Sequence, residues 1–146
     1  SLTRPIETEV FAYGRLPLAH SARCFTARHF NLQKDACEFR CLSIMDGIPL
    51  RTREGQPFLT LNGVQTQSAR VHNLLADLPS LASRAEVLRI SPQGAHGRDI
   101  IDIFRAALDG RLTPGTALDA SRDYMPEAPC NGFWHGRPGV EQYVAA

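Results

Sequence analysis

Thiols are the side chains of this sequence best suited to chemistry, and three of the four lie close together. Cys24, Cys37 and Cys41 fall within one stretch of eighteen residues, and Cys130 stands alone far along the chain. Cys37 and Cys41 have three residues between them. On a helical turn, residues at i and i+4 share one face, so two thiolates at this spacing could reach one metal centre.

The close cysteines lie in the most basic part of the chain. Residues 15–53 hold seven basic residues and three acidic ones, a net charge of +4 within a chain whose total is only +1. Neighbouring arginines favour the thiolate form of a cysteine, which binds metals and attacks electrophiles. The same pattern is also typical of a solvated basic face that happens to contain buried thiols.

Four cysteines leave several kinds of site open. A disulfide framework is less favoured, because 146 residues can build an ordinary core and nothing indicates secretion. Zinc sites usually combine two close pairs of ligands, and only one pair is close here. An iron–sulfur cluster needs thiolates and accepts wider spacings, although this is not the bacterial ferredoxin spacing. Cys130, near Trp134, is either a fourth ligand or a packed thiol.

Composition excludes several function classes. The net charge of +1 gives no overall attraction to nucleic acid or membranes. The longest uncharged stretch, residues 55–69, is too rich in Gln, Thr, Asn and Ser for a transmembrane helix. No phosphate-binding glycine motif is present, and the five histidines are dispersed. The chain begins with Ser and not Met, so we interpret it as part of a longer product.

Hydrophobic periodicity predicts alternating strands and helices that would position these side chains. The predicted strands cover residues 8–13, 58–61 and 87–90. The predicted helices cover residues 21–29 with Ser21 as N-cap, 71–78, 100–108 ending at Gly110, and 117–124. Asp46-Gly47 and Glu54-Gly55 predict turns that bound a hairpin arm.

This order predicts a single α/β domain or fragment in three parts: a cysteine-bearing segment (15–55), βαβα units (56–110) and a loop-rich tail (111–146). The polar stretches 62–68 and 91–97 would follow the carboxyl ends of two strands, where ligand-binding loops usually lie. Their composition equally suits ordinary turns. His72 is expected to be a partly buried packing residue of the first long helix.

The cysteine block and several further motifs resemble the collagenase-like peptidase family, and within it the UbiV-like branch tied to oxygen-independent ubiquinone biosynthesis. The resemblance rests on residues 13–29, 34–41, 52–55, 59–68, 88–93 and 130–134. It implies that this chain is the C-terminal half of a TIM-barrel-like (β/α) protein about twice as long. The cysteine-bearing segment would be an irregular insertion in that α/β fold.

The resemblance also implies a 4Fe–4S cluster with Cys24, Cys37 and Cys41 as ligands. The fourth ligand would come from an N-terminal half outside this chain, so Cys130 is not carried over as a ligand. Three arginines, Arg23, Arg28 and Arg40, would offset the negative charge of the cluster.

The implied function is oxygen-independent hydroxylation of the ubiquinone ring, with prephenate as the suggested oxygen donor. The implied partners are a UbiU-like sister protein, in a cytoplasmic heterodimer, and an accessory lipid-carrier protein. Catalytic residues are not assigned. The alternatives are an RNA-hydroxylating or peptidase member of the same family, and a non-catalytic partner subunit that binds zinc or no metal.

Overall fold

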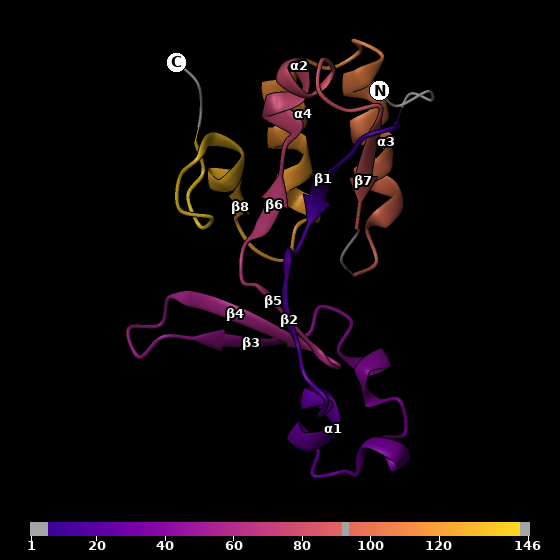
Figure 1. Cartoon of the computed structure of the whole chain (residues 1–146), viewed down its shortest axis with the longest axis vertical. Helices are drawn as coiled ribbons and strands as arrows, with labels where there is room; N and C mark the ends of the chain where they lie inside the picture. Colours follow the sequence, from indigo (N-terminus) through magenta and orange to yellow (C-terminus); the bar gives the residue numbers. More distant parts are fainter. Residues whose placement is uncertain (1–5, 92–93, 144–146) are drawn as a thin grey trace.

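The computed structural model describes residues 6–91 and 94–143, which form a mixed α/β structure with two four-stranded sheets (Figure 1). In the view of Figure 1 the sheet in the upper part carries the longer helices, and the lower sheet carries the cysteine-bearing segment. We call the upper one the mixed sheet and the lower one the antiparallel sheet. The observed fold class agrees with the expected α/β composition at this level.

The mixed sheet has the strand order β7-β1-β6-β8. Its strands are β1 (Glu9–Gly14), β6 (Val71–Asn73), β7 (Val87–Ile90) and β8 (Pro129–Cys130). β1 runs parallel to β7 and antiparallel to β6, and β6 runs parallel to β8. The strands expected at 8–13 and 87–90 are therefore confirmed as neighbours in one sheet.

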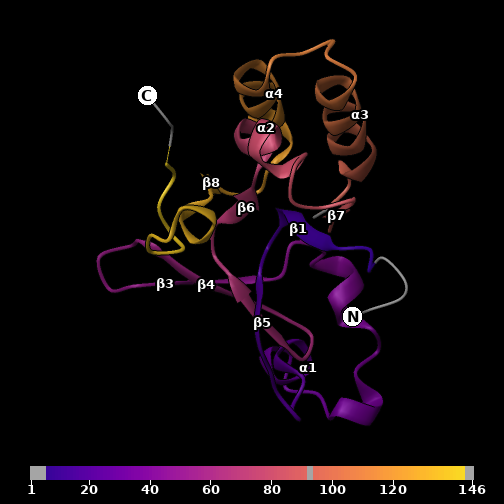
Figure 2. The same ribbon diagram turned by 45° about the horizontal axis from the view of Figure 1, so that its top comes forward.

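Helices cover the mixed sheet and complete the hydrophobic core (Figure 2). They are η3 (Leu75–Asp77), α2 (Leu78–Leu81), α3 (Gly97–Leu108) and α4 (Pro114–Ser121), followed by η4 (Arg122–Tyr124). Ile100 and Phe104 lie one turn apart on α3 and are buried, and the Tyr13 ring meets Phe104 edge-on at 6.1 Å between centroids. Burial raises the pKa of Tyr13 to about 12.

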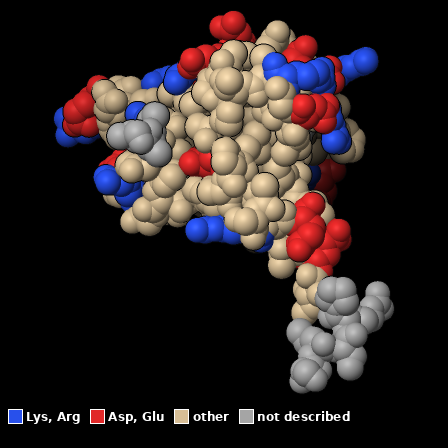
Figure 3. Space-filling model, turned by 90° about the horizontal axis from the view of Figure 1, so that it is seen from above, with Lys and Arg blue, Asp and Glu red and all other residues tan. Residues whose placement is uncertain are grey.

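Two of the expected helices are confirmed with shifted bounds. α3 begins three residues before the predicted 100–108, and the left-handed Gly110 follows its C-cap as expected. α4 begins at Pro114, where Thr113 caps the helix by accepting a hydrogen bond from the Thr116 amide at 3.2 Å. Figure 3 shows acidic and basic side chains interspersed around the rim of this end of the molecule.

The antiparallel sheet has the strand order β2-β5-β4-β3. Its strands are β2 (Pro17–His20), β3 (Ile48–Arg51), β4 (Pro57–Asn62) and β5 (Gln65–Ser68). The turn expected at Glu54-Gly55 joins β3 to β4, with Gly55 at φ 80°. The predicted hairpin arm is confirmed.

The βαβα pattern predicted for residues 56–110 is wrong in its first half. Residues 62–68 are not a loop after a parallel strand, because Gly63 and Val64 form a two-residue hairpin turn and Gln65–Ser68 returns as β5. Gly63 has φ 58°, which suits the first position of such a turn. The predicted helix at 71–78 is also wrong at its start, because Val71–Asn73 pairs with β1 as β6.

The chain passes between the two sheets twice, and the two connecting segments are in contact. It leaves the mixed sheet after Gly14, which has φ 130° and is so close to Ser91 that a Cβ would lie 2.3 Å from the Ser91 carbonyl oxygen. It returns after Ser68. The buried Arg15 joins the two crossings by donating to the carbonyl oxygens of Ser68, at 3.0 Å, and Ala69.

The end of the described chain folds back on the helices as a segment that we call the C-terminal strap, residues 131–143. It contains η5 (Gly132–His135). Asn131 organises it: its side chain donates to the Tyr143 carbonyl oxygen at 2.9 Å and to the Asp77 carboxylate at 2.9 Å. Residues 111–143 are thus less loop-like than predicted, since they also contain α4 and β8.

Candidate functional site

The three close cysteines lie in the segment between β2 and β3, which holds only short helices. These are α1 (Phe25–His29), η1 (Lys34–Ala36) and η2 (Arg40–Ser43). Most side chains here are exposed or half-buried, and Thr26 and Ala27 are its buried anchors. The Thr26 hydroxyl accepts from the Gly63 amide at 3.2 Å and so attaches α1 to the β4–β5 turn.

Cys24 is the N-cap of α1. Its half-buried sulfur accepts a hydrogen bond from the Ala27 amide at 3.4 Å. The prediction that Ser21 caps this helix is wrong, because Ser21 still bonds to Val64 in the manner of β2 and its hydroxyl accepts from Arg23 instead. The Cys24 sulfur nevertheless remains available to a metal ion, because sulfur is a weak acceptor and a metal–sulfur bond can readily replace this hydrogen bond.

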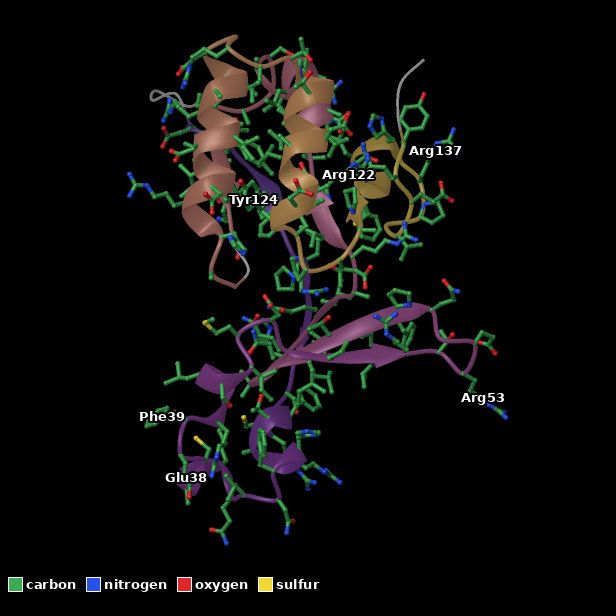
Figure 4. The ribbon with its side chains drawn as sticks, turned by 180° about the vertical axis from the view of Figure 1, so that it is seen from behind. Glu38, Phe39, Arg53, Arg122, Tyr124 and Arg137 are labelled. Carbon is green, nitrogen blue, oxygen red and sulfur yellow. The ribbon has the colours of Figure 1, made fainter. Side chains whose placement is uncertain are left out.

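Cys37 and Cys41 do not share one helical turn. Glu38 and Phe39, between them, both have left-handed backbones at φ 53° and φ 50°, which ends η1 and starts η2 in a new direction. In Figure 4 the labelled Glu38 and Phe39 lie at the outer edge of the segment. The one-face argument from the i, i+4 spacing is therefore wrong for this arrangement, although both thiols are free and half-buried.

Helix α1, which Cys24 caps, is in contact with η2, which contains Cys41. The Arg40 guanidinium lies 5.7 Å from the Phe30 ring centroid and forms an ion pair with Glu38 at 2.7 Å. Because Glu38 already balances the charge of Arg40, this arginine contributes less positive charge to the segment than its sequence position indicates.

A cavity of the segment lies beside Cys24. It has a volume of about 520 Å³, and its charged lining is entirely basic: Arg23, Arg28 and Lys34. Lys34 donates to the Ala22 carbonyl oxygen at 3.1 Å, and neither arginine forms an ion pair within the described part of the chain. An anionic group beside Cys24 would meet a positive potential with no carboxylate on the cavity wall.

The donor set of the segment fits an iron–sulfur cluster in its chemistry, because it offers three free, half-buried thiols and neighbouring cations. Its present geometry is not a ready-made site. Within residues 6–91 and 94–143, no group of three or more His, Cys, Asp or Glu side chains is arranged to hold a metal ion. Metal binding at such a segment would have to be coupled to its rearrangement.

Cys130 lies in a different part of the molecule from the other three. It is 1% exposed on β8 of the mixed sheet, opposite His72 of β6, and burial raises the pKa of its thiol to about 11. A buried thiol held in its protonated form suits packing and not ligation.

His72 is buried as expected, but on a strand. Its ring lies 6.1 Å from the Phe11 ring, and its Nδ1 has no hydrogen-bond partner among the described residues. Burial lowers the pKa of His72, against the opposing effects of a Phe11 hydrogen bond and the Asp77 charge. The predicted loop 91–97 lies partly outside the described residues.

A polar cluster that the sequence did not predict holds the C-terminal strap. Asp77 accepts from Asn131, and its other oxygen lies 2.8 Å from His135 Nε2. The His135 ring packs at a tilt against the Tyr143 ring, with 4.4 Å between centroids, and Trp134 Nε1 donates to the Ser80 hydroxyl at 3.2 Å. The hydrogen-bonded partners across this cluster, Asp77 with Asn131 and His135 and Ser80 with Trp134, are more than fifty residues apart in sequence, so no local motif indicates them.

Comparison with known proteins assigns no family to this chain. The chain matches no protein-family model and no solved structure. Across the described residues, no helix is long and apolar enough to cross a membrane.

Proposed function

We propose that this chain is the C-terminal half of a UbiV-like iron–sulfur protein of the collagenase-like peptidase family. It would act with a UbiU-like sister protein in oxygen-independent hydroxylation during ubiquinone biosynthesis, in a cytoplasmic heterodimer served by a lipid-carrier accessory protein. The observation that carries the proposal is the presence of three free, half-buried thiols, Cys24, Cys37 and Cys41, in one basic segment.

The segment has the properties expected of a part that orders around a cluster. It contains one five-residue α-helix and two 3₁₀ turns, and its left-handed residues between Cys37 and Cys41 leave the two thiols on separately oriented turns. Such a segment has little regular structure to lose when its thiols move, and ligand binding adds to its folding free energy.

Each residue of the proposed site has a distinct part. Cys24, Cys37 and Cys41 would hold a 4Fe–4S cluster, with the fourth ligand from an N-terminal half of the protein. Arg23 and Arg28, which make no ion pairs in the described structure, would offset its negative charge more than Arg40 does. A bound cluster supplies one-electron redox chemistry, and its potential depends on nearby charge and solvent exposure.

The mixed sheet supports the barrel-like part of the proposal only in outline. β1 and β7 are parallel neighbours with helices packed against them, as in a (β/α) fold. The antiparallel β1–β6 pair departs from a regular (β/α)₈ barrel. We therefore propose a half-barrel whose remaining strands belong to the N-terminal half.

Genetic complementation tests the functional part of the proposal. Deletion of the gene should abolish ubiquinone synthesis without O₂ and leave aerobic synthesis intact. The wild-type gene and a Cys130→Ser variant should restore anaerobic synthesis, and Cys37→Ser should not. Unchanged anaerobic ubiquinone in the deletion strain, with loss of an RNA hydroxylation instead, would refute the proposed substrate.

A further inference from the structure

A small apolar pocket lies far from the three close cysteines, between the antiparallel sheet and the C-terminal strap. Its volume is about 120 Å³, and its apolar wall comes from Leu16, Leu18, Phe58, Phe133 and Val140. Figures 1 and 2 both show the strap above the outer part of the β3–β4 hairpin. The pocket thus depends on chain segments more than one hundred residues apart.

The rim of this pocket is unusually exposed for apolar side chains. Leu18, Phe58, Phe133 and Val140 are each between 51% and 61% exposed, whereas Cys130 and Ala69 on its floor are buried. Scattered exposed apolar residues need no explanation, but several around one concavity indicate a binding surface.

One positive charge borders the apolar wall. Arg70 lines the pocket, forms no ion pair within the described residues, and meets no Asp or Glu on the lining. Burial raises the pKa of the Cys130 thiol on the pocket floor, and the positive charge of Arg70 partly opposes that shift. The Ser68 hydroxyl is already engaged, because it donates to the Arg70 carbonyl oxygen at 2.7 Å and accepts from the Leu16 amide at 2.9 Å.

We propose that this pocket binds a small aromatic monocarboxylate, with the ring against the apolar wall and the carboxylate on Arg70. The volume of about 120 Å³ limits the enclosed part of the ligand to at most one ring, since an apolar protein cavity of about 150 Å³ holds benzene. The unpaired guanidinium selects the charge, because Arg recognises carboxylates through paired N–H donors. This inference does not rest on the proposed iron–sulfur function.

The probe that tests the site is benzoate, compared with benzyl alcohol and benzylamine, which keep the ring and change the charge. Titrations followed by ¹H–¹⁵N NMR should show saturable shifts at the amides of Ala69, Arg70, Gly139 and Val140. We expect benzoate to bind with a Kd on the order of 1 mM, as its few heavy atoms allow. Benzylamine should bind at least about tenfold more weakly.

Two variants locate the ligand. Arg70→Gln should weaken benzoate at least about fivefold and leave benzyl alcohol unchanged, whereas Arg53→Gln, at the exposed hairpin turn, should change neither (Figure 4). Val140→Asp, at an exposed rim position, should repel benzoate without unfolding the protein.

Three outcomes would overturn the site. Non-saturable shifts with benzoate would do so, and so would equal affinity for the three probes. The third is a concentration-dependent self-association that Phe58→Ser abolishes, which would mean that the apolar rim is a protein interface. Neither Arg70→Gln nor Val140→Asp touches Cys24, Cys37 or Cys41, so failure here leaves the proposed function standing.

Discussion

Arg15 and Ser68 join the two points at which the chain passes between its sheets, through a hydrogen bond of 3.0 Å from the guanidinium to the carbonyl oxygen. Arg15 is only 6% exposed, and its Nε has no partner among the described residues. Burial lowers the pKa of Arg15, while the charges of Asp46 and Glu127 oppose that shift. The position of the antiparallel sheet under the mixed sheet therefore depends on a buried charge.

Replacement of this arginine should destabilise the fold. Arg15→Met removes the guanidinium N–H donors, so the carbonyl oxygens of Ser68 and Ala69 lose these hydrogen bonds. We therefore expect a loss of about 3 kcal/mol in the free energy of unfolding. Urea denaturation measures the change. Arg53→Met, at an exposed position, should stay within about 0.5 kcal/mol of wild type. Equal stability of the two variants would show that the buried guanidinium does not hold the sheets together.

The first crossing also needs a glycine. Gly14→Ala places a Cβ 2.3 Å from the Ser91 carbonyl oxygen at a left-handed backbone, and we expect a loss of about 2 kcal/mol or more. Gly115→Ala in α4 meets no atom within 4 Å and should raise stability by about 0.5 kcal/mol. Thermal unfolding of both variants checks the pair, and a stable Gly14→Ala protein would contradict the close approach.

His72 should make the protein sensitive to acid. Because its folded-state pKa is lowered by burial, the unfolded chain binds more protons as the pH falls below about 6.5, and stability falls with it. The contribution is fully present above that pH and is lost as the pH falls through the folded-state pKa. His72→Gln should therefore lose less stability than wild type between pH 7.5 and 5, measured as urea midpoints. His29→Gln, at an exposed ring, is the control.

Thiol reactivity should separate Cys130 from the other cysteines. Its burial and its raised pKa, about 11, keep the thiol protonated and covered. In metal-free protein at pH 8, a disulfide reagent should modify three thiols rapidly and the fourth only on unfolding. Cys130→Ser should remove the slow phase and leave the fast one. Four thiols reacting at one rate in folded protein would contradict this placement.

Sequence reasoning predicted the regular elements best where one periodicity dominates. β1, β7 and α3 follow from their own apolar patterns, and the hairpin arm follows from Asp46-Gly47 and Glu54-Gly55. The four residues Val71, Leu74, Leu75 and Leu78 have helical spacing and are all buried. Val71, however, belongs to the strand β6. The same spacing arises when a short strand turns into a helix over one core, so periodicity could not distinguish the two.

The candidate site was predictable in its residue types and not in its geometry. The thiols and the basic charge are visible in the sequence, whereas the left-handed Glu38 and Phe39 are not, because neither residue type requires that conformation. Contacts between distant residues, such as Asp77 with His135, leave no local pattern at all. The Gln65–Ser68 strand was missed because its side chains are all polar.

Iron and acid-labile sulfide analysis of the protein purified without O₂, together with the N-terminal half and the UbiU-like partner that we propose for it, tests the central claim most directly. We expect about four iron and four sulfide per chain, with absorbance near 400 nm, in wild type and Cys130→Ser. Cys24→Ser, Cys37→Ser and Cys41→Ser should each lose them, with folding checked by circular dichroism. A folded Cys37→Ser protein with full iron and sulfide, or wild type with one zinc and no sulfide, would contradict the account.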